Sequence, residues 1–299
     1  MQPLARGRRV ALSLETFRLL ALAGAVMLVV VVATGATVPL TGSGLGCEHW
    51  PGCAPHHFEP RSFHSYVEFG NRVVAFITIV ATLAAWVGAL LASTPRRMRW
   101  LAFGMFFGTL LQAPLGAITI HYHLNPYLVL SHFLLSIVVL TLGVVLAYDA
   151  VSLLRGRAPS ALPPWVRAGS LVVAIALLVL IVSGTLATAS GPHPGSQVVQ
   201  RLWSFEPAIY WHVRATAVFG ISFAILVAWL VRLRRPELRG ALVLLGILAV
   251  QMAIGETQYR TGLRWWLVLI HVAVAATTWS VGVAFVYSLW RPLAPRRIS

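Results

Sequence analysis

Long runs of apolar residues, separated by short polar connections, recur along the whole chain. A helix needs about 20 such residues to cross the hydrocarbon core of a bilayer. Eight spans are predicted, at residues 17–39, 66–92, 99–120, 127–149, 168–190, 207–231, 240–259 and 266–290. We therefore expect an all-α membrane protein. The first run is too long for the apolar region of a cleavable signal peptide, so we expect it to be a span.

Arginine gathers in every second connection. The segments "ARGRR", "TPRRMR", "RGRAPSALPPWVR", "RLRRPELR" and "RPLAPRR" are rich in it, and the connections between them hold only Arg61, Arg201, Arg260 and Arg264. Cytoplasmic loops carry an excess of basic residues. The pattern therefore predicts a multi-pass protein of the cell membrane with both termini in the cytoplasm.

Composition agrees with this class. Hydrophobic residues make up 58% of the 299 positions and charged residues only 10%, too few to cover a soluble domain of this size. The net charge of +15 comes from 23 basic residues, all of them arginine. Because these arginines lie in short loops between spans, we interpret the charge as a topology signal and expect no nucleic-acid partner.

The two halves of the chain resemble each other. Gln112, Gly116 and His132 recur 139 residues later as Gln251, Gly255 and His271. In the same order, "ATGATVPLTGSG" (33–44) parallels "VSGTLATASGPH" (182–193), and "EFGNR" (68–72) parallels "YWHVR" (210–214). Both halves start from the same side of the membrane. The sequence therefore predicts two pseudo-symmetric four-helix bundles related by a parallel repeat.

The predicted units follow from this repeat. We expect an N-terminal bundle at 17–154 and a C-terminal bundle at 168–290, joined by a cytoplasmic linker at 155–167. The remaining segments, 1–16 and 291–299, are expected to be cytoplasmic tails.

Two histidines of the second half lie inside predicted spans. His212 and His271 enter spans six and eight from the same side and to a similar depth. A core histidine with satisfied hydrogen bonds is the ordinary interpretation of either residue alone, but polar groups in a bilayer are costly and tend to mark function. Two imidazoles on facing helices suit axial ligation of a haem iron. Zinc fits less well, because no third or fourth ligand is evident at that depth.

The first half has one of these ligands. His132 corresponds to His271, but Asn71 stands at the position of His212, and a carboxamide is a poor iron ligand. This predicts a haem bound from one side. Glu68 lies one turn from Asn71 and could relay protons there; the alternative is an ion pair with Arg72 at the helix end. We interpret His64, on the same stripe, as a solvated interfacial residue, with propionate binding or remote ligation as alternatives.

Cys47 and Cys53 are the only cysteines, and both lie in the first non-cytoplasmic loop. A structural disulfide closing a short loop is one interpretation, and a redox-active pair is the other. The spacing alone does not decide between them. The histidines in or beside the same set of loops receive no ligand role: His49, His56, His57, His121, His123 and His193.

Taken together, these stretches resemble the heme A synthase family, its actinobacterial branch in particular. The resemblance rests on "TGSGLGC…WPGC" (41–53), "VEFGNRVVAF" (67–76), "LLQAPLGAITI…LNPYLVLSHFLLS" (110–136), "IYWHVRA" (209–215) and "QMAIGETQYRTGLRWWLVLIHV" (251–272). It implies an enzyme that oxidises the C8 methyl of haem O to a formyl group, giving haem A for terminal oxidases. Molecular oxygen or water would be the oxygen source.

The resemblance also implies roles for residues. A haem b cofactor would lie between His212 and His271, and the substrate haem near His132. Glu68 matches a glutamate regarded as essential to catalysis in the family. The two cysteines match an outer pair thought to exchange disulfides.

One position departs from the family pattern. Many members have histidine where this chain has Asn71, so that E-x-x-H-R reads "EFGNR" here. This argues against two histidine ligands on the substrate haem but leaves an open coordination position for oxygen chemistry. Asn71 would hydrogen-bond a water or an oxygen-derived ligand, and Arg72 would pair with Glu68 or with a haem propionate.

Two other classes remain as alternatives. A membrane cytochrome b that carries electrons without modifying haem fits the second half equally well, and a transporter would bind no haem. A prenyl transferase needs several aspartates, and Asp149 is the only one in the chain. Handing over the substrate makes a complex with haem O synthase a natural hypothesis, and a homo-oligomer is a further one. The sequence does not identify the electron donor.

Overall fold

The fold is described from a computed structural model of the chain, over residues 11–47, 49–50, 52–54, 59–193, 195 and 201–294. His56, His57 and the outer parts of both tails therefore lie outside the described residues. The eight helices of the described part are α1 (Leu14–Leu40), α2 (Phe63–Leu91), α3 (Arg96–His121), α4 (Pro126–Arg155), α5 (Pro164–Ser190), α6 (Phe205–Arg232), α7 (Leu238–Arg260) and α8 (Trp265–Trp290).

The eight predicted spans are confirmed. Helix bounds lie within four residues of the predicted ones, except that α4 continues six residues beyond 149. Local sequence explains several ends. The Ser62 hydroxyl accepts from the backbone N–H of Ser65 in a capping box that starts α2. Asn125 and Pro126 start α4, and Gly156 ends it with a φ of 77°, which favours glycine.

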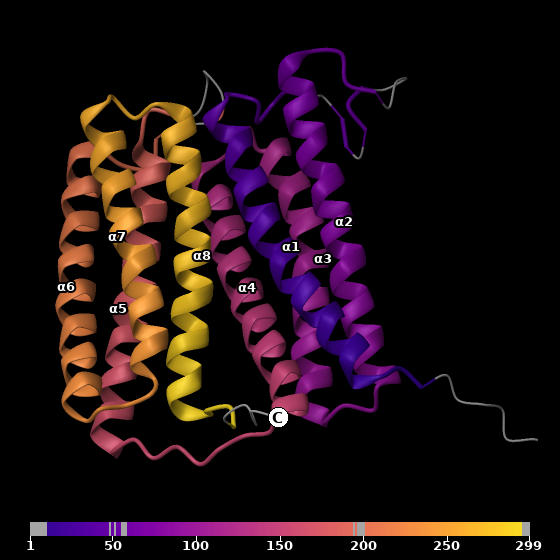
Figure 1. Cartoon of the computed structure of the whole chain (residues 1–299). Coiled ribbons are helices and arrows are strands. Elements are labelled where there is room, and N and C mark those ends of the chain that lie inside the picture. Colours follow the sequence, from indigo (N-terminus) through magenta and orange to yellow (C-terminus); the bar gives the residue numbers. More distant parts are fainter. Residues whose placement is uncertain are drawn as a thin grey trace, which may run out of the picture.

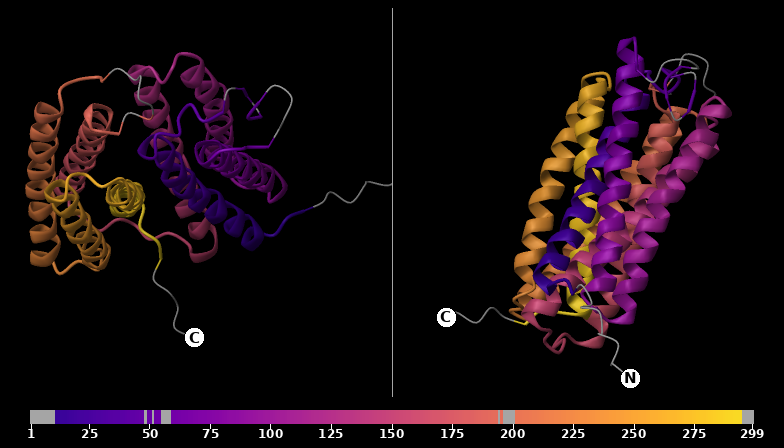
Figure 2. Two further views of the ribbon diagram at one scale, coloured as in Figure 1. Left: turned by 90° about the horizontal axis from the view of Figure 1, so that it is seen from above. Right: turned by 90° about the vertical axis from the view of Figure 1, so that its right-hand side faces the viewer.

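The helices run side by side in two groups (Figure 1). Seen from above, α1–α4 lie on one side and α5–α8 on the other, with α8 next to α1 and α4 (Figure 2). This arrangement is compatible with two four-helix bundles. We call the end that carries the loop 41–62 the cysteine end. The opposite end, where α1 begins and the linker 156–163 runs, is called the arginine end.

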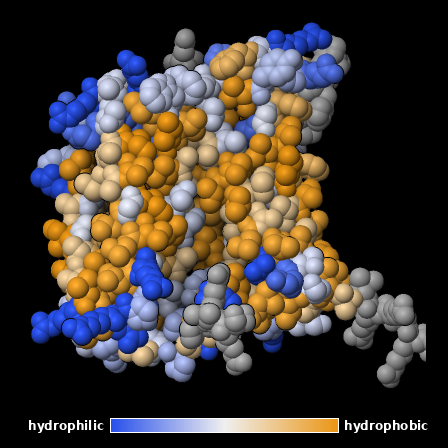
Figure 3. All heavy atoms as spheres, viewed as in Figure 1, coloured by the Kyte–Doolittle hydropathy of each residue, from blue (hydrophilic) through white to orange (hydrophobic). Residues whose placement is uncertain are grey.

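The lateral surface is apolar. Hydrophobic residues form a broad belt across the face seen in Figure 3, with polar residues gathered at its two ends. Large side chains in the middle of helices are open to the surroundings, such as Phe76 at 66% and Ile221 at 63%. All eight helices are long and apolar enough to cross a bilayer. Lipid can cover this belt, so the chain is a multi-pass membrane protein.

A carboxylate joins the two halves near the arginine end. Asp149 on α4 is 2% exposed and forms ion pairs with Arg97 on α3 and Arg157 in the linker. Its Oδ1 also accepts a hydrogen bond of 2.8 Å from the Tyr287 hydroxyl on α8. Because a buried carboxylate is stable only when paired and hydrogen-bonded, these partners hold α3, α4, α8 and the linker together.

The linker is also bonded to the segment after α8. Ala158 N–H donates to the Pro292 carbonyl and Ala294 N–H to the Gly156 carbonyl, each at 3.0 Å. Further from this end, the Trp279 indole N–H of α8 donates to the Thr141 hydroxyl of α4 at 3.0 Å. The two halves are therefore connected at several levels.

Candidate functional site

The two histidines of the second half face each other. His212 on α6 and His271 on α8 have ring centroids 6.5 Å apart, with the rings nearly perpendicular. A metal ion with an imidazole nitrogen about 2 Å away on either side would separate two ring centroids by roughly 6 Å. The spacing of the two rings therefore fits a haem iron ligated from both sides.

A serine fixes the ring of His212. The Ser183 hydroxyl on α5 donates to the Leu180 carbonyl at 2.8 Å. Its oxygen can therefore accept from Nδ1–H of His212, which lies 3.1 Å away. With the proton on Nδ1, the lone pair on Nε2 is available to a metal, and the partner of Nδ1 sets the ring orientation. Gly184 lets the ring approach α5, because a Cβ there would lie 3.0 Å from Cε1 of His212.

Helix α7 supports His271 from the other side. The Gln251 amide nitrogen donates to the His271 carbonyl at 3.1 Å and lies 3.2 Å from Nε2 of its ring. A Cβ on Gly255 would lie 3.1 Å from Cε1 of His271. The repeated Gln, Gly and His of the sequence thus have structural roles. The glutamine hydrogen-bonds to the histidine, and the glycine leaves room for the histidine ring.

The first half repeats this arrangement. The Gln112 amide donates to the His132 carbonyl at 3.1 Å and to the Ser136 hydroxyl at 2.7 Å. A Cβ on Gly116 would lie 3.5 Å from Cε1 of His132. Among the described residues, the same buried atoms have no hydrogen-bond partner in both halves: Nδ1 of His132 and His271, and Oε1 of Gln112 and Gln251. Buried polar atoms normally have partners, so their recurrence suits two sites that a ligand completes.

Asn71 occupies the place of His212. The Thr34 hydroxyl on α1 donates to Oδ1 of Asn71 at 3.0 Å, as Ser183 contacts His212 in the second half. Gly35 faces Asn71, as Gly184 faces His212, with a Cβ position 3.8 Å from Oδ1. These contacts match the two positions residue by residue.

Glu68 is buried at the start of α2 and bonded to the cysteine loop. It is 4% exposed; its Oε2 accepts from the Cys47 N–H at 2.9 Å, and its Oε1 pairs with Arg72. The ion pair that the sequence offered as an alternative is therefore present, and a second bond accompanies it. Arg72 also donates to the carbonyls of His49 and Gly52, at 2.7 and 2.6 Å.

A disulfide joins Cys47 and Cys53. The carbonyls that Arg72 binds belong to the short loop closed by this disulfide, so the loop, Arg72 and Glu68 form one unit. His64 lies nearby, with Nδ1 2.9 Å from the Ser43 hydroxyl. The described residues contain no cluster of three or more His, Cys, Asp or Glu side chains suited to a metal ion.

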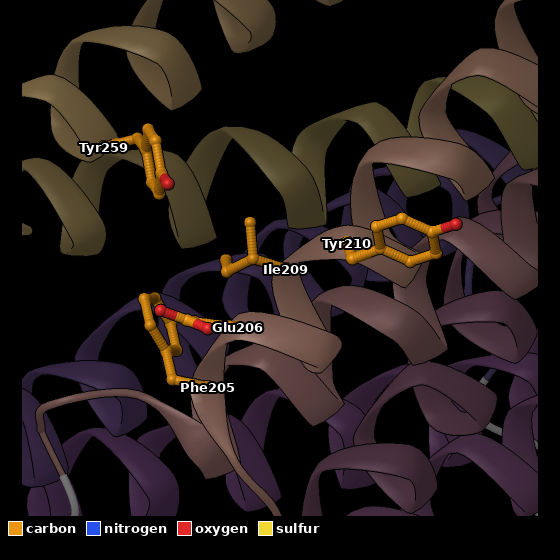
Figure 4. A pocket seen from close by; sticks show the side chains of 5 residues that line it. All are labelled: Phe205, Glu206, Ile209, Tyr210 and Tyr259. Atoms are coloured by element: carbon orange, nitrogen blue, oxygen red, sulfur yellow. The ribbon is translucent and has the colours of Figure 1, made fainter.

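The sequence did not indicate one further feature. A pocket of about 300 Å³ lies between the start of α6 and the end of α7 at the cysteine end. Figure 4 shows Ile209 between Tyr259 of α7 and the side chains of Phe205 and Glu206. Phe205 and Ile209 stand two helical turns and one helical turn before His212, on its face of α6. The pocket therefore lies above the histidine pair, toward the cysteine end.

Comparison with known proteins identifies the family. The family described as cytochrome oxidase assembly protein matches residues 18–283. The chain belongs to this family. The match includes both halves and every candidate ligand in them.

Three individual proteins that the chain resembles agree with this family assignment. The chain is 27% identical to the heme A synthase of Symbiobacterium thermophilum over an alignment 292 residues long, which covers 90% of this chain and 94% of that protein. It is 35% identical to the heme A synthase of Geobacillus kaustophilus over 106 residues, covering 34% of this chain and 33% of that protein. For the heme A synthase of Listeria monocytogenes the identity is 33% over 132 residues, with 43% and 41% covered. The matches to the last two relatives thus span less than half of their lengths.

Proposed function

We propose that this member of the family is a heme A synthase, an oxidoreductase that converts the C8 methyl of haem O to the formyl group of haem A. The observation that carries the proposal is the repeated polar arrangement. Both halves hold a histidine between a glutamine and a glycine, yet at the matching position on the second helix of each half the second half has an imidazole, His212, where the first has Asn71. Two protein ligands on one iron suit a resident cofactor, whereas a substrate must arrive, react and leave.

The second half would hold the cofactor. His212 and His271 would bind a haem b iron, with Ser183 fixing the tautomer of one imidazole and Gln251 supporting the helix that carries the other. When bound, haem b supplies one-electron redox chemistry. In this proposal 17–154 and 168–290 are the substrate and cofactor units.

The first half would bind the substrate haem through His132. Glu68 is the proton-handling group of this site, since a buried carboxylate with two fixed hydrogen-bond partners stays close to one geometry. Arg72 contributes by holding that carboxylate against the cysteine loop. Asn71 leaves the second side of the substrate iron open to a ligand from molecular oxygen or water.

Orientation and partners complete the proposal. The arginine end would face the cytoplasm and the cysteine end the outside of the cell membrane, which reporter fusions to the loops would test. Substrate hand-over suggests a complex with haem O synthase, and co-purification from membranes tests it. A homo-oligomer would appear as a multiple of the chain mass in native mass spectrometry.

The catalytic role of Glu68 is tested by substitution. In cells that make haem O, we expect the Glu68→Gln and Glu68→Ala proteins to keep the haem b spectrum but to accumulate haem O or a hydroxylated intermediate. Glu256→Gln is the matched control, because Glu256 forms the same i, i+4 ion pair with Arg260 on α7 but is exposed. Normal haem A formation by Glu68→Ala protein would remove Glu68 from the mechanism.

A further inference from the structure

A hydroxyl side chain occupies the same position in both halves. Thr34 on α1 and Ser183 on α5 stand at matching places of the repeated segments 33–44 and 182–193. Each lies three residues after a backbone carbonyl it can bond, Val31 in the first half and Leu180 in the second. Each also contacts a side chain on the next helix, Asn71 for Thr34 and His212 for Ser183.

The two hydroxyls have opposite hydrogen-bonding roles toward the side chain on the next helix: Ser183 accepts and Thr34 donates. Ser183 gives its hydrogen to the Leu180 carbonyl at 2.8 Å, so its oxygen accepts from His212. Thr34 lies closer to Oδ1 of Asn71, at 3.0 Å, than to the Val31 carbonyl, at 3.3 Å. Since Oδ1 carries no hydrogen, Thr34 must be the donor in this bond.

The direction of each hydrogen bond decides whether the side chain on the next helix can present a lone pair to an iron. In the second half, the bond leaves the Nε2 lone pair of His212 for the metal. In the first half, Oδ1 of Asn71 is held against α1, and the other branch of the planar amide is the NH₂ group. That group has only hydrogens to offer, so it donates and cannot ligate.

We propose that Thr34 is a positioning residue that turns the NH₂ group of Asn71 toward a diatomic ligand, dioxygen, on the open side of the substrate iron. This inference rests on the proposed function and deepens it. Hydrogen-bond donors on the open side of a haem help to decide whether oxygen is bound or activated. A histidine at position 71 would close that side instead.

Neighbouring groups leave this role to Asn71. Glu68, one turn away, has its carboxylate oxygens engaged by the Cys47 N–H and by Arg72. The Gln112 amide nitrogen already donates to the His132 carbonyl and to Ser136. Gly35 lies opposite Asn71 without a side chain that could displace the amide.

Carbon monoxide is the probe that tests the proposal. The full-length protein, purified in detergent from cells that supply haem O, is reduced and exposed to CO, and the C–O stretching frequency is recorded by infrared spectroscopy. Because His212 and His271 would ligate the other haem iron from both sides, CO would report on the first half alone. Loss of the signal in a His132→Ala protein confirms that assignment.

A matched pair of variants isolates the hydroxyl. Thr34→Val keeps the shape and removes the donor, so we expect a higher C–O frequency and CO release about 5-fold faster, the factor that a hydrogen bond of about 1 kcal/mol provides. Asn71→Leu should show at least the same shift. Thr34→Ser keeps a hydroxyl and should match the parent protein.

Two results would overturn the inference. One is a Thr34→Val protein with the parent frequency and release rate; the other is a parent protein with both haems that binds no CO. Haem A measured in the same cultures separates the two proposals. Normal haem A formation with an unchanged frequency defeats the role of Thr34 alone, whereas the expected shift without haem A from the parent protein defeats the proposed function alone.

Discussion

Substituting alanine for Gly184 should loosen the haem of the second half. The added Cβ would lie 3.0 Å from Cε1 of His212, and ordinary contact begins at 3.4 Å. The ring must therefore retreat by about 0.4 Å, whereas metal–ligand distances vary by only about 0.2 Å. Overpacking of this kind costs about 1–3 kcal/mol, which corresponds to haem binding about 5- to 150-fold weaker.

Gly220→Ala is the control on the same helix as His212. Nothing lies within 4 Å of a Cβ at position 220, and a helical glycine replaced by alanine gains about 1 kcal/mol of helix propensity in both variants. The difference between the two proteins thus isolates the contact with the ring. Gly116→Ala in the first half, with a Cβ distance of 3.5 Å, should disturb His132 far less.

The assay is haem b per protein, together with the rate of haem transfer to apomyoglobin and the reduced-minus-oxidised spectrum. We expect Gly184→Ala protein to carry less haem b, to lose it faster and to show a weaker two-imidazole spectrum. A Gly184→Ala protein that retains haem b as Gly220→Ala protein does would refute the assignment of His212 as an iron ligand.

Three more substitutions test the surroundings of these sites. Asp149→Asn should lower the melting temperature by several degrees, because Asp149 is buried and joins both halves; an unchanged melting temperature would contradict that role. Tyr287→Phe removes the hydrogen bond from Tyr287 to Asp149 and should lower the free energy of unfolding by about 1 kcal/mol. A loss as large as that of Asp149→Asn would show that Tyr287 contributes more than this bond. Arg72→Gln removes the bonds to the cysteine loop and should speed proteolysis between Cys47 and Cys53 while the rest of the chain resists; equal cleavage rates would show that other contacts hold the loop.

The membrane helices followed from the sequence because the apolar pattern and the arginine loops are local properties of the chain. The repeat could be found for the same reason, since Gln251, Gly255 and His271 keep the spacing of their counterparts. The roles of these residues were not evident from the sequence, because a glycine makes room for a histidine ring only when two helices pack against each other. Ser183 was part of a repeated segment, yet its bond to His212 depends on the approach of α5 to α6.

Other contacts could not be read from the pattern. The bond from the Cys47 N–H to Glu68 spans 21 residues and depends on how the loop folds back onto α2. Asp149 had one available signal, as the single aspartate of the chain at the end of an apolar helix. Its partners come from three separate segments, and a sequence pattern does not show which of several nearby arginines will reach it.

The most direct test of the account is to identify the haems made by the cells and the haems bound to the purified protein. The chain is produced with haem O synthase in cells that otherwise make no haem A, and extracted haems are separated by chromatography. We predict haem A in those cells, and haem B with haem O, haem A or a hydroxylated intermediate on the protein. Haem B alone, without haem A in the cells, would contradict the synthase and favour an electron carrier.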